Sequence, residues 1–174
     1  PDSGSIAIHG KPVNIHSPRH AIDLGIGMIH QHFKLIDVLS AAENILLAEK
    51  GAPFLSKRAA AAKITNVMEK YGMQIDLGRK ILDMSVSEKQ TVEILKVLYR
   101  GAKILILDEP TAVLTPQEIE KLFDILRNLV KKECAVIIIT HKLNEVMSIS
   151  DRVTVLRQGE SVKTLETKST NIRE

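Results

Sequence analysis

An uninterrupted apolar run, Ile104–Leu107, ends directly in two adjacent acids, Asp108 and Glu109. Gly101 and Pro110 bound this segment, and a short apolar run between such residues predicts a strand that is buried on both faces. Because carboxylates are costly to bury without a partner, the two acids belong at the point where the strand ends. Sheets of α/β proteins bind their ligands at the carboxyl ends of parallel strands. The segment therefore predicts an α/β fold with an acidic site at one sheet edge.

The second half of the chain alternates strands and helices. Residues 103–108 and 135–140 are two apolar segments, both predicted to be buried strands. Between them, Thr115, Pro116 and Glu118 have the types and spacing of an N-cap, a first helical position and a capping-box acid. Strand–helix–strand alternation indicates a parallel sheet with crossover helices.

The first half of the chain follows a different pattern. Ile26–Ile29 is a short apolar segment and a predicted strand, whereas residues 33–80 are mostly helical and interrupt the alternation. Ser85 and Glu88 have the spacing of a capping box, which predicts that another helix begins at Ser85. We therefore expect a helical lobe beside the sheet.

Composition narrows the class of protein. The chain has 174 residues, of which 44% are hydrophobic and 26% charged, as in ordinary soluble globular domains. Only 3% are aromatic and the net charge is only +3, so we expect no nucleic-acid partner. The single Cys134 excludes an internal disulfide and fits a reducing cytosol. No apolar run is long enough to span a bilayer, so any role at a membrane is expected to come through a partner.

Four residues that follow predicted strands are candidates for chemistry. Asp108 offers the oxygen ligands that Mg²⁺ prefers, and Glu109 could orient or deprotonate a water molecule. His141 follows the second buried strand as Asp108 follows the first, and could hold a phosphate or that water. Gln31 follows Ile26–Ile29, and its amide could touch metal and water together. Each has a structural alternative: solvated acids, an ordinary strand-end histidine and a loop glutamine.

The predicted helix start at Ser85 is a second candidate. Residues Ser85, Ser87 and Glu88 surround unsatisfied N–H groups at the positive end of the helix dipole, where phosphates bind. A plain capping box explains Ser85 and Glu88 equally well. Thr115 carries the same ambiguity, because its N-cap role is sufficient by itself.

The order of these elements resembles the ATPase domain of ABC transporters over nearly the whole chain. The matching positions are Gln31 for the Q-loop, residues 84–88 for the signature, Ile104–Glu109 for the Walker B strand, residues 111–115 for the D-loop and His141 for the switch histidine. Residues 28–47, 87–118 and 140–160 are similar to the importers of simple sugars and nucleosides, in which two such domains are fused.

The resemblance implies a three-layer, P-loop-NTPase-like α/β core with a mostly parallel sheet plus an α-helical subdomain, incomplete in this chain. Residues 1–32 would be part of the RecA-like core up to the Q-loop. Residues 33–84 would be the helical subdomain. Residues 85–174 would be the signature helix and the rest of the core.

The resemblance also implies roles and partners. Glu109, His141 and Gln31 would be catalytic, Asp108 and Gln31 would hold Mg²⁺, and ATP would meet Ser85, Ser87, Glu88 and Thr115. The partners would be a second ATPase domain and transmembrane permease subunits, with a solute-binding protein acting indirectly. The location would be the cytoplasmic face of the cell membrane.

The sequence departs from this family at several positions. It contains no Gly-x-x-x-x-Gly-Lys-Ser/Thr loop, and the only Gly-Lys pair, Gly10-Lys11, precedes a proline. We interpret this as an N-terminal truncation, and expect the parent protein to hydrolyse ATP and this chain to be inactive alone. Val86 and Ser87 replace two signature glycines. Two other interpretations stay open: a soluble ABC ATPase outside transport, and a non-catalytic interaction module.

Overall fold

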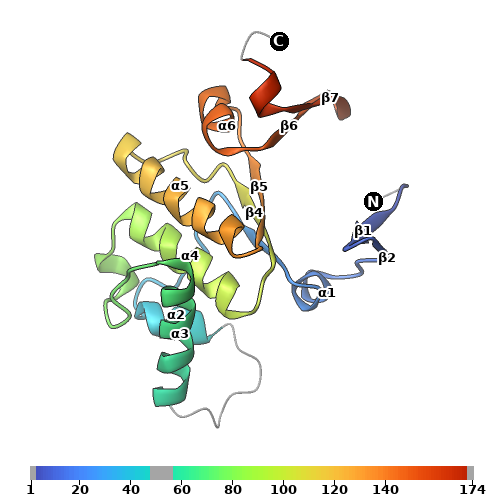
Figure 1. Ribbon diagram of the computed structural model, residues 1–174. Helices are drawn as coiled ribbons and strands as arrows, with labels where there is room; N and C mark the ends of the chain where they lie inside the picture. The colour runs from blue at the N-terminus through green and yellow to red at the C-terminus, as the bar shows by residue number, and fades with distance from the viewer. Residues whose placement is uncertain (1–2, 48–56, 172–174) are drawn as a thin grey trace.

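The computed structural model describes residues 3–47 and 57–171. A sheet of three parallel strands lies at its centre, in the order β3 (Ile26–Ile29), β4 (Ile104–Asp108) and β5 (Ala135–Ile139) (Figure 1). Ile104 pairs with Ile26 on one side and with Ala135 on the other. The prediction of a parallel sheet with crossover helices is confirmed, and the three strands end at the same edge.

Helices α4 (Val86–Tyr99) and α5 (Pro116–Lys131) cover one face of this sheet (Figure 1). The strands present Ile29, Leu105 and Leu107 to them, each at most 1% exposed. The helices contribute the other half of the core, which includes Val92, Ile94, Leu95, Phe123, Leu126 and Leu129. Large apolar side chains from the sheet and from the helices bury one another at this interface, and their burial is the main source of stability in this layer.

The other face of the sheet is open within the described residues. Met28 is 41% exposed, Ile137 50% and Ile139 48%. The prediction that the strand at 135–140 is buried on both faces is therefore wrong, and Ile104 and Ile106 of β4 are also only partly buried. An uninterrupted apolar run places apolar side chains on both faces of the strand. The helices in the described residues cover only one of these faces.

A group of helices lies beside α4. It consists of α2 (Ala41–Leu46), α3 (Lys57–Tyr71) and the short 3₁₀ helix η1 (Ile81–Asp83) (Figure 1). Ile45, Ile64 and Ile81 meet in its interior and are fully buried. Gly72, at a φ of +68°, ends α3 in the left-handed conformation that glycine favours after a helix. The expected helical content of residues 33–80 is present in the described part of this range.

The remaining elements lie at the periphery. The hairpin β1 (Ile6–Ile8) and β2 (Lys11–Val13) precedes α1 (Pro18–Asp23). At the other end of the chain come α6 (Leu143–Ile149), the hairpin β6 (Arg152–Arg157) and β7 (Glu160–Glu166), and η2 (Thr167–Ser169). None of the helices in the described residues combines the length and the apolar character that a membrane span requires.

Candidate functional site

The carboxyl ends of the three parallel strands bring four predicted site residues to one sheet edge. Gln31 follows β3, Asp108 is the last residue of β4 and Glu109 comes next, and His141 follows β5. Gln31 is exposed, whereas Asp108 and Glu109 are partly buried. The arrangement follows directly from strand direction, since parallel neighbours end together.

Glu109 and His141 are in direct contact. The Nδ1 atom of His141 lies 2.9 Å from the Oε1 atom of Glu109, with the histidine side chain 72% exposed and the glutamate side chain 32% exposed. A carboxylate oxygen can only accept, so the hydrogen bond requires a proton on Nδ1. In the neutral ring, Nε2 is then left as an acceptor that points away from the carboxylate.

The backbone of Glu109 is held in an uncommon conformation. Its φ is +45°, in the left-handed region that few residues other than glycine adopt. Its N–H donates to the carbonyl oxygen of Ile139 at 2.9 Å, which ties the turn after β4 to the end of β5. Strain of this kind persists where surrounding structure fixes it, and it gathers at functional sites.

Asp108 and Gln31 supply the oxygen donors at this edge. In register, Asp108 lies opposite Ile139 at the carboxyl end of the sheet. Within the described residues there is no group of three or more His, Cys, Asp or Glu side chains that could hold a metal ion. Mg²⁺ commonly binds through one or two carboxylates plus substrate phosphates, so the donors present fit that ion together with a nucleotide.

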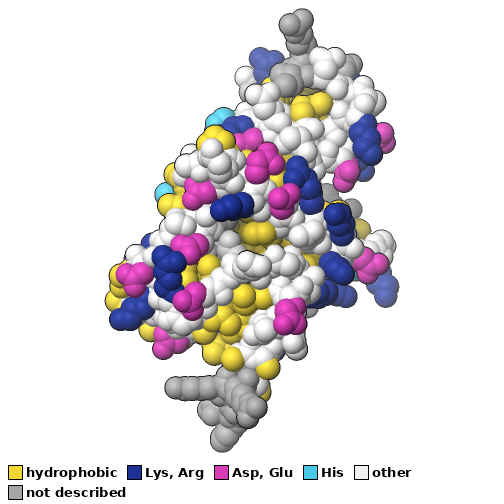
Figure 2. Space-filling view, turned by 60° about the vertical axis from the view of Figure 1, so that its left-hand side comes forward, with side chains coloured by type: hydrophobic (Ala, Val, Ile, Leu, Met, Phe, Trp, Pro, Cys, Tyr) yellow, Lys and Arg dark blue, Asp and Glu magenta, His cyan; other side chains and the backbone are white. Residues whose placement is uncertain are grey.

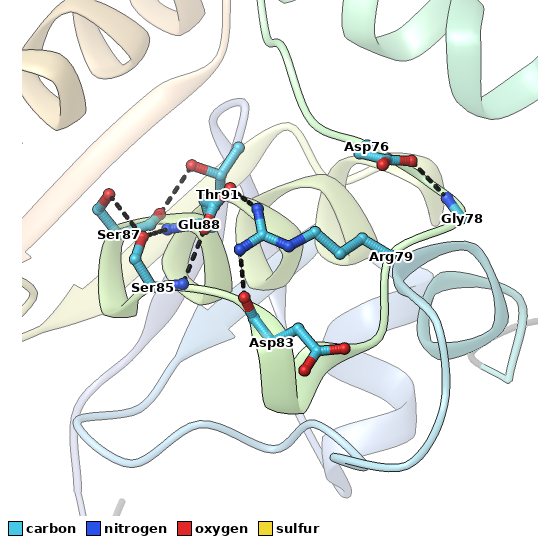
Figure 3. Close-up of polar contacts among 8 residues, drawn as sticks. All are labelled: Asp76, Gly78, Arg79, Asp83, Ser85, Ser87, Glu88 and Thr91. Atoms are coloured by element: carbon cyan, nitrogen blue, oxygen red, sulfur yellow. Dashed lines mark hydrogen bonds and ion pairs between the residues drawn. The ribbon is translucent and has the colours of Figure 1, made fainter.

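The start of α4 gathers the second set of predicted site residues (Figure 3). Ser85 is the N-cap: its Oγ accepts from the N–H of Glu88 at 3.3 Å, and Oε2 of Glu88 accepts from the N–H of Ser85 at 2.7 Å. The predicted capping box is therefore confirmed. The other carboxylate oxygen of Glu88 pairs with Nη1 of Arg79 at 2.7 Å, and Arg79 also donates to the carbonyl oxygen of Asp83.

The start of α5 repeats this arrangement and lies against the start of α4. Thr115 is the N-cap, and Oε2 of Glu118 accepts from its N–H at 2.9 Å. The hydroxyl of Ser87 is near enough to Glu118 to help lower the pKa of that carboxyl. Ser87, Glu88 and Glu118 line one open pocket of about 320 Å³ between the helices. Within residues 3–47 and 57–171, no hydrogen bond or ion pair links this helix-start group to the strand-end group.

We expect acid to weaken both helix starts. The backbone N–H of Ser85, assisted by Arg79, holds the pKa of Glu88 below its ordinary value of 4.5 despite partial burial. The N–H of Thr115 likewise lowers the pKa of Glu118. Because both native pKa values lie below those of the unfolded chain, their stabilisation is complete above pH 4.5 and is lost as the pH falls through the lowered values.

Urea unfolding between neutral pH and about pH 3 measures this loss. Glu88→Gln should flatten the pH dependence of the unfolding midpoint, because it removes the titrating group and keeps an acceptor. Glu120→Gln, on an exposed position of α5, is the matched control and should leave the dependence unchanged. Equal pH dependence in Glu88→Gln and the parent chain would contradict the expectation.

Sequence reasoning missed a buried acid that anchors the segment after Gln31. Glu93 of α4 is 5% exposed, and its Oε1 accepts from the N–H of Lys34 at 2.9 Å. Lys96 neutralises it at 3.1 Å and also donates to the carbonyl oxygen of Lys34 at 2.7 Å. The only signal in the sequence is an acid between two apolar residues, Val92 and Ile94.

A second missed cluster lies behind Glu109 and His141. Thr111 is 1% exposed, and its hydroxyl donates to Oε2 of Glu145 at 2.6 Å. Lys142 donates to the carbonyl oxygen of Thr111 at 2.9 Å. The sequence gives no signal for such a cluster, because the spacing of its threonine, lysine and glutamate matches no known motif.

Comparison with known proteins agrees with the geometry. The family model for the ABC transporter matches residues 1–112. The chain is 49% identical, over 95% of its length, to the nucleoside import ATP-binding protein NupA of Lactococcus lactis subsp. cremoris. It is 50% identical, over 98%, to the guanosine import ATP-binding protein NupO of Bacillus subtilis. It is 41% identical, over 95%, to the ribose import ATP-binding protein RbsA 3 of Rubrobacter xylanophilus.

The match to these relatives is partial on their side. The chain spans only 33% of the Lactococcus protein and 34% of each of the other two. Among solved structures, cbiO1 from Clostridium perfringens, part of the ABC transporter complex cbiONQ, superimposes with a TM-score of 0.81 at 25% identity. That match covers 97% of this chain and 68% of the solved one. The α/β fold with its parallel sheet is thus the fold of ABC ATPase cassettes, and the chain belongs to the ABC transporter family.

Proposed function

We propose that these residues belong to the ATP-binding subunit of an importer that couples MgATP hydrolysis to uptake of a nucleoside or a sugar. The observation that carries the proposal is the contact between Glu109 and His141, 2.9 Å apart, directly after Asp108 at the carboxyl edge of a parallel sheet. Residues 1–32 and 85–174 form the RecA-like core in this proposal, and residues 33–84 form the helical subdomain.

Each strand-end residue has a distinct part in hydrolysis. Glu109 accepts a proton from the attacking water or orients it. His141 donates its Nδ1–H to that carboxylate, which leaves Nε2 as an acceptor that can hold a water molecule. Asp108 and Gln31 would hold Mg²⁺ through oxygen atoms, and the ion, when bound, would supply positive charge against the phosphates. Gln31 also contacts the attacking water, so this one side chain links the metal ligands to Glu109.

A second ATPase domain completes the nucleotide site in this proposal. Ser85 and Ser87 at the start of α4, with Thr115 at the start of α5, face a nucleotide that the second domain holds, and Glu88 keeps that helix start in place. The exposure of Val86, at 37%, and Val113, at 69%, supports a contact surface here. The side chains of Val86 and Ser87 narrow the space for a phosphate compared with glycine.

Transmembrane permease subunits dock on the helical lobe, so that the domain works at the cytoplasmic face of the cell membrane and meets a solute-binding protein only indirectly. Large apolar side chains support this: Ile36 is 48% exposed, Val38 67% and Leu82 52%. The N–H of Leu82 donates to the carbonyl oxygen of Asp37 at 3.0 Å, so the two segments lie together. Acidic and basic side chains are interspersed on the face shown in Figure 2, an arrangement that favours a protein partner over nucleic acid there.

Transport by a chimeric protein tests the proposal. The aligned third of the Lactococcus nucleoside import protein would be replaced with this chain, and uptake of labelled nucleoside and ribose would be measured in cells that lack the native protein. We expect uptake of one of these solutes above the level of the empty strain. A chimera that assembles with the permease but imports neither solute would overturn the proposal.

The 174-residue chain alone is expected to bind ATP too weakly to saturate at micromolar concentrations, and to show no turnover. Its sequence contains no Gly-x-x-x-x-Gly-Lys-Ser/Thr loop, the element that cradles phosphates in this class of enzyme. Calorimetry and a phosphate-release assay measure the two properties. Stoichiometric binding at micromolar affinity, with turnover abolished by Glu109→Gln, would contradict this expectation.

A further inference from the structure

The contact between Glu109 and His141 is too exposed to hold itself in place. The histidine side chain is 72% exposed, and an ion pair or hydrogen bond in such a position contributes about 0–1 kcal/mol. Both residues lie on loops that follow strands, and the bond from the N–H of Glu109 to the carbonyl oxygen of Ile139 fixes only the backbone where the first loop begins. Farther along the two loops, the described residues offer a partly buried cluster that joins them.

This cluster consists of Thr111, Lys142 and Glu145. The Nζ atom of Lys142 donates to the carbonyl oxygen of Thr111 at 2.9 Å and lies 3.3 Å from its hydroxyl. The hydroxyl donates in turn to Oε2 of Glu145 at 2.6 Å. Lys142 and Glu145 form an ion pair at 3.3 Å, which closes the triangle. Every bond is charge-assisted or buried, the class that contributes most per contact.

The three residues of the cluster lie on the loop that carries Glu109 and on the segment that follows His141, so the cluster joins these two parts of the chain. Thr111 lies on the loop that carries Glu109, and Lys142 directly follows His141. The N–H of Lys142 donates to Oγ1 of Thr140 at 3.1 Å, so the backbone on both sides of His141 is fixed. Thr111 is 1% exposed, the Glu145 side chain 14% and the Lys142 side chain 34%, so the threonine and the glutamate have little room for alternative arrangements.

We propose that Thr111, Lys142 and Glu145 are positioning residues that clamp the two loops together and thereby set the Nδ1–carboxylate contact between His141 and Glu109. The proposal rests on the proposed roles of these two residues in hydrolysis. None of the three positioning residues touches the reacting atoms. Loss of the Thr111 hydroxyl removes its bond to Glu145 and leaves the bond from Lys142 to the Thr111 carbonyl oxygen as the cluster's only link between the two loops, which weakens the clamp.

The test is the ¹⁵N resonance of His141 Nδ1 in the full 174-residue chain, read from long-range ¹H–¹⁵N spectra. His141→Asn assigns the signal among the six histidines. Glu109→Ala gives the position of the resonance when the contact is absent. We expect Thr111→Val to move the wild-type resonance most of the way to that position, and Thr111→Ser, which keeps a hydroxyl, to restore it.

A second variant and a matched control complete the design. Lys142→Met keeps the aliphatic stem, and should shift the resonance in the same direction even if Thr111→Val does not fold. Thr154→Val removes an equivalent hydroxyl from the β6–β7 hairpin, where Thr154 and Thr164 are 3.0 Å apart, and should leave the resonance unmoved. An unchanged resonance in Thr111→Val and Lys142→Met overturns the proposal, as does a wild-type resonance that Glu109→Ala does not move. The readout needs no nucleotide, so its failure is distinct from a failure of transport or hydrolysis.

Discussion

Replacing Glu109 with glutamine is expected to lower the ATP turnover of the chimeric import protein by about two to four orders of magnitude. The amide cannot take a proton from water at neutral pH, whereas the carboxylate can. Glutamine keeps an oxygen that accepts from Nδ1 of His141, so the contact at 2.9 Å can persist in some form. The substitution therefore removes the proposed base and leaves the surrounding structure largely in place.

Phosphate release at saturating MgATP, together with the dissociation constant for nucleotide, measures the effect. Turnover should fall while the dissociation constant stays nearly constant, since the proposed role of Glu109 lies in the chemical step. Glu160→Gln, at an exposed position in the β6–β7 hairpin, is the matched control and should retain full turnover. Comparable turnover in both variants would show that Glu109 is not the base.

Gly27→Ala is expected to have the largest effect on stability. A Cβ atom added at Gly27 would lie 1.9 Å from Cγ1 of Val97 and 3.2 Å from Cβ of Ala102. Val97 is β-branched and lies on α4, where its side chain has one strongly preferred rotamer and cannot turn away. Overpacking of a core costs about 1–3 kcal/mol, and we expect the upper end of that range here.

Urea unfolding of matched variants tests this. In Gly78→Ala the added Cβ would meet only Oδ1 of Asp76, at 3.5 Å, an ordinary contact, so this control should keep the parent stability. The double variant Gly27→Ala, Val97→Ala removes the clashing methyl and should recover part of the loss. If Gly27→Ala and Gly78→Ala unfold at the same urea concentration, β3 does not lie as close to α4 as the structure has it.

Local signals in the sequence were sufficient for the helix starts. The capping boxes at Ser85 and Thr115 involve residues three positions apart, so their chemistry is complete within one turn. The common edge of Asp108, Glu109 and His141 was also predictable, because parallel neighbours end together. The catalytic, metal and nucleotide roles of these residues stay predictions.

Non-local contacts account for what the sequence did not reveal. The apolar run at 135–140 does not predict that Ile138 packs against the core while Ile137 stays half exposed. The residues that cover one face of a strand come from other parts of the chain. The bonds of Glu93 to Lys34 and of Thr111 to Glu145 likewise join distant residues. Tertiary packing determines which distant residues become partners. Periodicity and capping rules describe only residues that are close in sequence, so they cannot predict these pairs.

The order of the three strands in space has a consequence for how the chain folds. β3 is made early, but its only strand neighbour among the described residues is β4, which follows the whole helical lobe. Closing so long a loop is entropically costly, whereas the helices between the two strands form through nearby contacts. We therefore expect the helical lobe to fold first during synthesis. β3 then stays unpaired until β4 has been made. Gln31 then meets Glu109 and His141 only when the sheet closes, so the assembled strand-end group marks a late step of folding.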